Sequence, residues 1–141
     1  MRNIFILPEY WSNKFIGACG WIRLLDPLLN ERISGEHKVE YGYSLTKEII
    51  KSDVVIFERL WHPNEVKINE IIELLKKLKK NNSKIIYSID DNLLDFPNYQ
   101  KSDWYSQIHL SVINVFLFYA DVVVVSTYSL KQRLSNYNKN I

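Results

Sequence analysis

The sequence predicts an α/β fold, a Rossmann-like three-layer sandwich in which helices cover both faces of a parallel sheet. Strand-like and helix-like segments alternate five times along the 141 residues, and parallel strands need such crossover connections. The segment "DVVIFE" is almost continuously apolar, which is typical of a strand buried on both faces. The length suits one domain with a real core and is short for two, so a single domain is expected over residues 1–141.

Three strands and two helices are predicted in the first half of the chain. The strands are expected at Asn3–Leu7, His37–Tyr43 and Asp53–Glu58. Between the first two, apolar residues spaced at i, i+3, i+4 and i+7 indicate an amphipathic helix from Trp21. Pro27 lies inside it, so we expect the helix to kink there or to restart at Asp26. A second short helix is expected over residues 44–52.

The second half is predicted to contain two strands and three helices. We expect the strands at Lys84–Ile89 and Asp121–Ser126, and the helices at Asn64–Lys80, Asp103–Tyr119 and Tyr128–Ser135. The first of these helices carries isoleucine and leucine along one side. Asp103 and Thr127 are suitable N-caps for the other two.

The strand order follows from the polarity of the segments. The last three strands have the apolar character of central strands, and the more polar second strand suits an edge. We therefore expect the order 2-1-3-4-5, with a switch point between the first and third strands. Ligands of such sheets bind outside the carboxyl ends of the strands, so functional residues are expected in the loops that follow them.

Composition narrows the classes of partner. The net charge of +2 is too small to predict nucleic-acid binding. Cys19 is the single cysteine, which excludes a disulfide framework and agrees with a reducing, cytoplasmic location. The most apolar stretch contains Asn114 and Asp121 and is too short to span a membrane. The basic run "KKLKKNNSK" is most simply a solvated helix end; its alternative interpretation is peripheral contact with the inner membrane face.

Polar and aromatic residues follow several of the predicted strands. They are Glu9, Trp11, Gly17 and Gly20 after the first, Glu58, Arg59, Trp61 and His62 after the third, and Asp90 and Asp91 after the fourth. Aromatic faces beside carboxylates suit a sugar, and the guanidinium groups of Arg23 and Arg59 suit a phosphate or a carboxylate. We expect Trp11, Trp21 and Trp61 to contribute to an exposed apolar patch at this end of the sheet.

Asp90 and Asp91 are the most informative pair. Two carboxylates directly after a buried strand are costly unless they face water, a ligand or hydrogen-bond donors. At least one is therefore expected to face the crevice between the first, third and fourth strands. The structural alternative is that the pair caps a helical turn or pairs with Arg59.

Other candidates also have two interpretations. The segment "GACG" is either a turn or a place where the backbone approaches a phosphate at a helix N-terminus. His62 is either a loop histidine or a base. Adjacent carboxylates can hold magnesium. One large class of metal-dependent sugar transferases has an aspartate pair with one residue between the two, and this pair has no such spacer. A receiver domain is excluded, because it needs an acidic pair after the first strand and a lysine after the fifth.

Three segments resemble the N-terminal half of GT-B-fold glycosyltransferases of the bacterial, family 4-like kind. They are "SDVVIFERLW", "KIIYSIDDNLLDFP" and "ADVVVVSTYSLKQRL", and "GACGWIRLLDPL" resembles the helix that follows the glycine loop of that family. The resemblance covers nearly the whole chain. It implies a domain that binds a sugar or lipid-linked acceptor, opposite a second domain that binds most of the nucleotide-sugar donor. The chain alone is then expected to be inactive.

The resemblance also implies roles for individual residues. Gly17 and Gly20 would lie near the donor phosphates, and Trp21, Arg23, Arg59 and His62 would contact phosphate or acceptor. Asp90 and Asp91 would bind acceptor hydroxyls, and one would act as base if the reaction inverts configuration. The family needs neither metal nor other cofactor, and its products are polysaccharides or glycoconjugates. The alternative function is a non-catalytic module that binds a ligand or docks a partner, such as one subunit of a split transferase.

Overall fold

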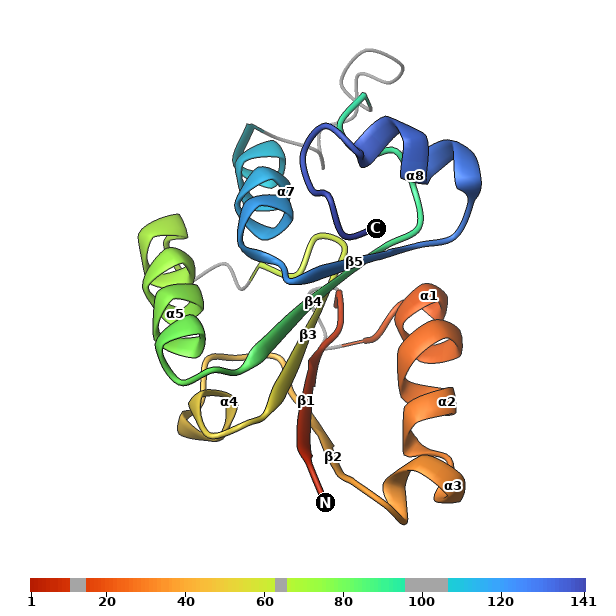
Figure 1. Cartoon of the computed structure of the whole chain (residues 1–141), viewed down its shortest axis with the longest axis vertical. Helices are drawn as coiled ribbons and strands as arrows, with labels where there is room; N and C mark the ends of the chain where they lie inside the picture. Colours follow the sequence, from red (N-terminus) through yellow and green to blue (C-terminus); the bar gives the residue numbers. More distant parts are fainter. Residues whose placement is uncertain (11–14, 63–65, 96–106) are drawn as a thin grey trace.

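A computed structural model describes residues 1–10, 15–62, 66–95 and 107–141 (Figure 1). Within these residues, five strands form one sheet: β1 (Asn3–Leu7), β2 (Lys38–Tyr41), β3 (Val54–Glu58), β4 (Lys84–Ile89) and β5 (Val122–Val125). Neighbouring strands are all parallel, and their order is β2-β1-β3-β4-β5. The predicted fold class and strand order are confirmed, and the carboxyl ends of β1, β3 and β4 lie next to one another.

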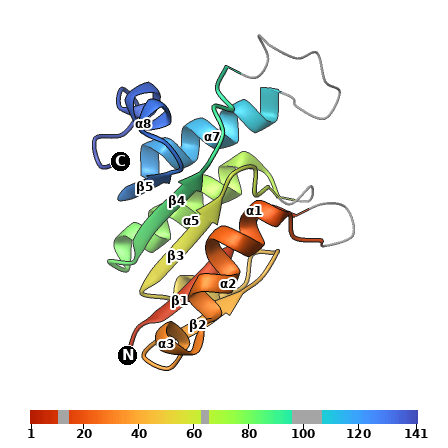
Figure 2. The same cartoon turned by 90° about the vertical axis from the view of Figure 1, so that its right-hand side faces the viewer.

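Helices cover both faces of the sheet (Figures 1 and 2). One face carries α4 (Lys47–Ile50), α5 (Ile68–Lys80), α7 (Gln107–Tyr119) and α8 (Tyr128–Leu134). The other face carries a continuous helical segment made of α1 (Ala18–Gly20), the π-helical turn η1 (Trp21–Leu25) and α2 (Asp26–Leu29), followed by α3 (Glu31–Ser34). The segment that begins at α1 starts where β1, β3 and β4 end, so Cys19 and Gly20 contact residues at the end of β3.

The larger core lies beneath α4, α5 and α7 and contains a cluster of aromatic rings. Phe116 of α7 stacks on Phe57 with ring centroids 4.7 Å apart and lies 5.2 Å from the Tyr87 ring. Trp61 packs 5.3 Å from Phe57 and is fully buried. The expectation that Trp61 belongs to an exposed patch is therefore wrong, because its ring completes this core. Trp11 lies outside the described residues.

The smaller core lies on the α1–α2 side of the sheet. Leu24 and Leu25 pack there against Ile6, Val54 and Ile56, which alternate in sequence with the strand residues of the larger core. This covering ends before β5. On the same side of β5, Val122 and Val124 remain 43% and 44% exposed.

Several element boundaries differ from the sequence predictions. The helix expected from Trp21 begins earlier, at Ala18. At Asp26 the π-helical turn is followed by α-helix without a break in the helical backbone, and Pro27 lies in the first turn of α2, where a missing N–H is tolerated. Of the helix expected from Asn64, residues 63–65 lie outside the described part, and α5 begins only at Ile68. The predicted cap Asp103 also lies outside the described residues.

Hydrogen bonds at the helix starts explain two other boundaries. Thr127 caps α8 as predicted, since its hydroxyl accepts from the Leu130 N–H at 3.2 Å. The short helix α3 was not predicted; it starts where the Asn30 side chain accepts from the Arg32 N–H at 3.1 Å. None of the helices in the described part of the chain has the length and apolar character needed to cross a bilayer.

The aromatic core yields a test of the fold. Replacing buried Phe116 with alanine (Phe116→Ala) should lower the free energy of unfolding by about 3–5 kcal/mol, because the change leaves a cavity beneath α7. Phe118, on the same helix but 76% exposed, provides the matched control: Phe118→Ala should change stability by about 0.5 kcal/mol or less. Urea unfolding measures both, and equal losses would contradict the packing described above.

Candidate functional site

Arg59 is the centre of an ionic cluster at the carboxyl ends of three strands. It directly follows β3. Its Nε lies 2.9 Å from a carboxylate oxygen of Glu9, which follows β1. Its Nη1 donates to Asp90 and to Asp91, which follow β4, at 2.8 Å each. One guanidinium group therefore joins the three loops at the predicted switch point.

The backbone of Arg59 is held in an unusual conformation. Its φ is 45°, in the left-handed region that costs a non-glycine residue about 1–2 kcal/mol. Two hydrogen bonds to β4 fix this conformation: the Arg59 N–H donates to the Ser88 carbonyl at 2.9 Å, and the Tyr87 hydroxyl donates to the Arg59 carbonyl at 2.9 Å. Strained backbone that its surroundings hold in place often occurs at functional sites.

Asp90 is almost completely engaged by cations. One of its carboxylate oxygens accepts from Arg59, and the other lies 3.4 Å from Nη1 of Arg23 in η1. Burial opposes its ionisation, but a hydrogen bond from the Cys19 thiol and the charges of the two arginines outweigh this effect and lower the pKa of Asp90. The carboxylate is thus ionised and already paired, which makes it a weak base.

Asp91 and Glu9 complete the charge distribution. The Asp91 side chain is 61% exposed, so its carboxylate faces solvent at the carboxyl end of the sheet. Burial raises the pKa of Glu9, although the adjacent Arg59 counteracts this effect. Burial by itself would lower the pKa of Arg59, but the Glu9, Asp90 and Asp91 carboxylates raise it above its ordinary value and keep the guanidinium charged.

Glu58 is a second buried carboxyl group beside this cluster. It is the last residue of β3 and only 1% exposed. Its Oε2 accepts from the Glu9 N–H at 2.9 Å and lies against Gly20, where an added Cβ would be 2.5 Å away. Burial raises the pKa of Glu58 to about 7, the Glu9 N–H opposes this rise, and the Glu9 charge adds to it.

Four buried polar atoms in and beside the ionic cluster have no hydrogen-bond partner among the described residues. Two are the guanidinium nitrogens Nη1 of Arg23 and Nε of Arg59, which lie within ion-pair distance of Asp90 and Glu9. The other two are Oε1 of Glu58 and Oγ of Ser88. The two residues are paired in register across β3 and β4, so their side chains leave the sheet side by side on the α1 face. Buried polar groups without partners are uncommon in proteins, and here they lie directly behind the ionic cluster.

Cys19 contacts the cluster but is not an activated nucleophile. Its sulfur lies 3.7 Å from Nη1 of Arg59. Its pKa is raised, first by the hydrogen bond that it donates to Asp90 and then by burial. A thiol held in its protonated form is a poor nucleophile, so Cys19 contributes a hydrogen bond rather than chemistry.

An aromatic cavity lies beside the ionic cluster, on the other side of the start of α1. Its volume is about 460 Å³, and it is lined by Phe15, Ile16, Ala18, Trp21, Ile22, Tyr41 and Tyr43. Trp21 directly follows Gly20, the residue that packs on Glu58. Trp21 is exposed, as predicted. A ring face and carboxylates are therefore available at one end of the sheet.

The remaining predicted site residues have different surroundings. Gly17 precedes α1, and a Cβ there would meet no atom within 4 Å, so nothing in its surroundings requires glycine. His62 is paired within its own loop, where its Nε2 lies 2.7 Å from the Val66 carbonyl. This contact holds the His62 ring at the backbone, and no contact among the described residues joins the ring to the ionic cluster.

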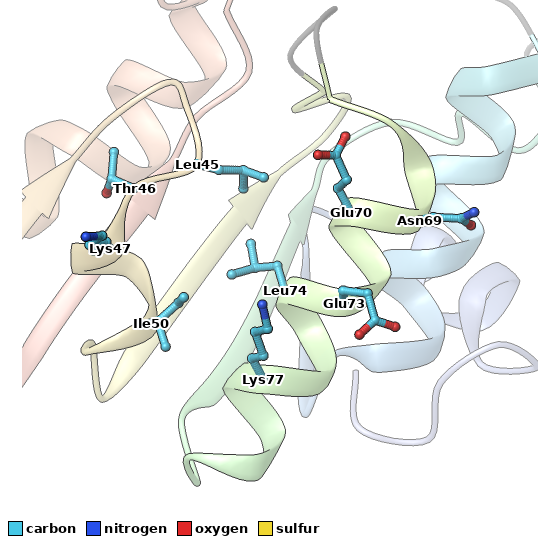
Figure 3. A pocket seen from close by; sticks show the side chains of 9 residues that line it. All are labelled: Leu45, Thr46, Lys47, Ile50, Asn69, Glu70, Glu73, Leu74 and Lys77. Carbon is cyan, nitrogen blue, oxygen red and sulfur yellow. The ribbon is translucent and has the colours of Figure 1, made fainter.

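A second cavity of about 450 Å³ lies between α4 and α5 (Figure 3). Leu45, Ile50 and Leu74 form its apolar part. Glu70 accepts from the Lys67 N–H at 2.8 Å and so caps α5, and Glu73 pairs with Lys76 at 2.9 Å. These carboxylates already serve the helix, so we place the functional site at the strand ends instead.

The sequence placed Glu9 and Glu58 at strand ends but did not identify them as site residues. The signal in Glu58 is its position: it continues an apolar strand in phase with Val54 and Ile56, which face α1 and α2. Cys19 gave no signal besides its place between the two glycines. No group of three or more histidine, cysteine, aspartate or glutamate residues in the described segments is arranged to hold a metal ion.

Comparisons with known proteins assign no family. No protein-family model matches the chain. A match is likewise absent among the curated proteins and among the solved structures. The function must therefore be argued from the site itself.

The contact between Gly20 and Glu58 yields a matched pair of substitutions. Gly20→Ala should lower the free energy of unfolding by about 1–2 kcal/mol, because the new methyl group meets a buried, hydrogen-bonded carboxylate and the Ile16 side chain. Gly17→Ala should leave stability unchanged or raise it by up to about 1 kcal/mol, since its φ of −62° suits alanine. Chemical denaturation distinguishes the two, and an unaffected Gly20→Ala protein would contradict the close packing.

The raised pKa of Glu58 predicts that the stability of the fold depends on pH. A carboxyl group whose folded-state pKa is raised from 4.5 to about 7 binds more protons in the folded state, so its contribution to stability falls as pH rises through this window. Glu58→Gln mimics the protonated group and should therefore match the wild type near pH 5 and exceed its stability at pH 8, by up to about 3 kcal/mol.

Melting temperatures at the two pH values measure this effect. Exposed Glu36 supplies the control, and Glu36→Gln should give the same small difference from wild type at both pH values. A Glu58→Gln difference that does not depend on pH would show that the group titrates as an ordinary glutamate.

Proposed function

We propose that this chain is the acceptor-side domain of a GT-B-fold glycosyltransferase, and that its crevice binds a sugar acceptor. The observation that supports this most is the ionic cluster around Arg59 at the switch point of the sheet, where the Asp91 carboxylate is exposed. An aromatic cavity around Trp21 lies at the same end of the sheet, on the other side of the start of α1. Carboxylates accept hydrogen bonds from sugar hydroxyls, and an aromatic face suits the apolar side of a sugar ring. Switch points are the usual ligand sites of such sheets.

Asp91 and Asp90 have different roles in this proposal. Asp91 is the carboxylate that reaches the acceptor, because it is the exposed member of the cluster and Arg59 holds one of its oxygens in place. Asp90 positions Arg59 and Arg23 rather than accepting a proton, because its oxygens face these two groups. If the reaction inverts configuration, Asp91 is the base that receives the proton of the attacking hydroxyl.

The other half of the reaction needs a donor site. In the proposal, a second Rossmann-like domain faces the carboxyl ends of this sheet and binds the nucleotide sugar, whether it belongs to the same polypeptide or to a partner chain. The transferred sugar then reaches an acceptor that is held by Asp91. The products are a polysaccharide or glycoconjugate and a free nucleotide.

A non-catalytic sugar-binding module is the second candidate. The full engagement of Asp90 by guanidinium groups favours it, since this carboxylate is not free to remove a proton. Both candidates predict ligand binding in the same crevice. They differ in whether the chain supports sugar transfer when the donor domain is supplied.

Sugar binding tests the proposal directly. Titration of the full chain with a neutral hexose should shift amide NMR signals around Glu9, Arg59 and Asp91. Asp91→Asn should weaken this binding about tenfold, since it removes a charged acceptor at the site. Asp26→Asn, at an exposed aspartate of α2, removes the same charge elsewhere and should leave the affinity unchanged.

Two outcomes would contradict the proposal. One is the absence of shifts for a panel of hexoses, or shifts only around the cavity between α4 and α5. The other is turnover of a nucleotide sugar by this chain alone, because the donor site is placed on another domain.

A further inference from the structure

The aromatic cavity around Trp21 has a lining without charged side chains. Of the residues that line it, Phe15, Trp21, Tyr41 and Tyr43 are aromatic, and the others are isoleucine and alanine. Its polar side-chain groups are the Trp21 indole N–H and the two tyrosine hydroxyls. The volume of about 460 Å³ lies in the range of small-molecule sites, so the cavity can hold a ligand of its own.

The tyrosine wall of the cavity is fixed to the sheet. Tyr41 is the last residue of β2, and Gly42 separates it from Tyr43. The Gly42 N–H donates to the Ile6 carbonyl of β1 at 3.0 Å. The Tyr43 carbonyl accepts from the indole N–H of buried Trp61 at 3.1 Å. These two hydrogen bonds position the backbone that carries both tyrosine rings.

The tryptophan wall is also held in place. The Trp21 N–H donates to the Gly17 carbonyl at 3.1 Å. Gly20, directly before Trp21, packs against the Glu58 side chain at the end of β3. Because the backbone of both walls is fixed in this way, a ligand need not order them when it binds, and the cost of binding is lower.

The orientation of the tyrosine rings indicates the shape of the ligand. The planes of Tyr41 and Tyr43 are 87° apart, with ring centroids separated by 6.4 Å. A flat ligand therefore cannot stack on both rings at once. A compact, rounded group can contact rings that stand at right angles. The π-electrons give the face of each ring a partial negative charge, so a positive charge on this group is favoured.

We propose that the aromatic cavity binds a small molecule that carries a trimethylammonium group. Cations bind over aromatic faces, most strongly over tryptophan, and quaternary ammonium ligands are recognised in this way. Such a group has a methyl surface and no N–H, so it loses no hydrogen bond in a cavity whose lining lacks carboxylates. A primary ammonium group has three donors to satisfy and suits this lining less well.

This inference does not depend on the proposed sugar-binding function. The cavity and the ionic cluster around Arg59 share no residue. An anion would suit the cavity poorly, because no cationic side chain lines it. The trimethylammonium group can belong to a free solute such as choline or to the head group of a lipid, and both present the same chemistry to the rings.

A comparison of choline with 3,3-dimethyl-1-butanol tests the inference on the full chain. The second compound has the shape of choline, with a carbon atom in place of the charged nitrogen. We expect choline to bind about tenfold more tightly, because only the cation is attracted to the ring faces. Ethanolamine, which is charged but has N–H groups instead of methyl groups, should also bind more weakly than choline. NMR titration that follows the Trp21 indole N–H measures all three affinities.

Paired substitutions separate the aromatic face from the fold. Trp21→Ala should weaken choline binding about tenfold or more, whereas Trp21→Phe keeps a ring and should lose less. Tyr41→Ala should weaken binding, and Tyr41→Phe should leave it nearly unchanged. Trp21 and Tyr41 are 49% and 42% exposed, so their replacement should preserve the fold, which melting temperatures check. Phe118→Ala, at an exposed ring of α7, is the control and should not affect binding.

Vesicles distinguish the two sources of the ligand. Cosedimentation with phosphatidylcholine vesicles, together with choline binding, would assign the site to a lipid head group. Choline binding without cosedimentation would assign it to a free solute. Both results support the site, whereas binding only to phosphatidylglycerol vesicles, which lack the trimethylammonium group, would contradict it.

The failures of the two proposals are distinct. Equal binding of choline and its carbon analogue, absence of choline binding, or unchanged affinity in Trp21→Ala would overturn this inference and leave the sugar-binding function intact. Asp91→Asn should weaken hexose binding and keep choline binding. Loss of choline binding in Asp91→Asn would place the cation at the ionic cluster and would also overturn the inference.

Discussion

The candidate site depends on one guanidinium group that three loops share. Arg59 contacts Glu9 after β1 and the aspartate pair after β4, so its side chain holds together elements that are far apart in sequence. Exposed ion pairs contribute little to the free energy of unfolding. Here the guanidinium, Glu9 and Asp90 are largely buried, and the removal of one partner would leave a buried charge without compensation. The same contacts define which carboxylate remains available to a ligand, namely Asp91.

The fold could be predicted almost completely from the sequence. Periodicity and polarity predicted the five strands and their order, because a central strand buried on both faces consists of consecutive apolar residues, such as Val54–Phe57. Helix starts were harder to predict. The start of α5 depends on a hydrogen bond between Lys67 and Glu70, and the π-helical turn at Trp21–Leu25 has no simple sequence signature.

The site was predicted only in part. The position of Asp90 and Asp91 at the end of β4 suggested polar partners, and pairing with Arg59 was one of the alternatives. The central role of Arg59 could not be derived, because it depends on a left-handed backbone conformation at a non-glycine residue. Trp61 was misplaced for a related reason. A tryptophan in a loop after a strand can turn outward or inward, and only the tertiary structure shows that its ring joins Phe57 and Phe116.

The Tyr87 side chain connects the ionic cluster to the aromatic core. Its hydroxyl holds the carbonyl of Arg59, while the Tyr87 ring packs against Phe116 of α7. One ring therefore connects α7 with the residue that organises three loops. Conversely, a ligand that shifts Arg59 must work against a close-packed interior that yields little. Rigidity of this kind favours recognition of a ligand by a preformed site rather than by adaptation of the loops around it.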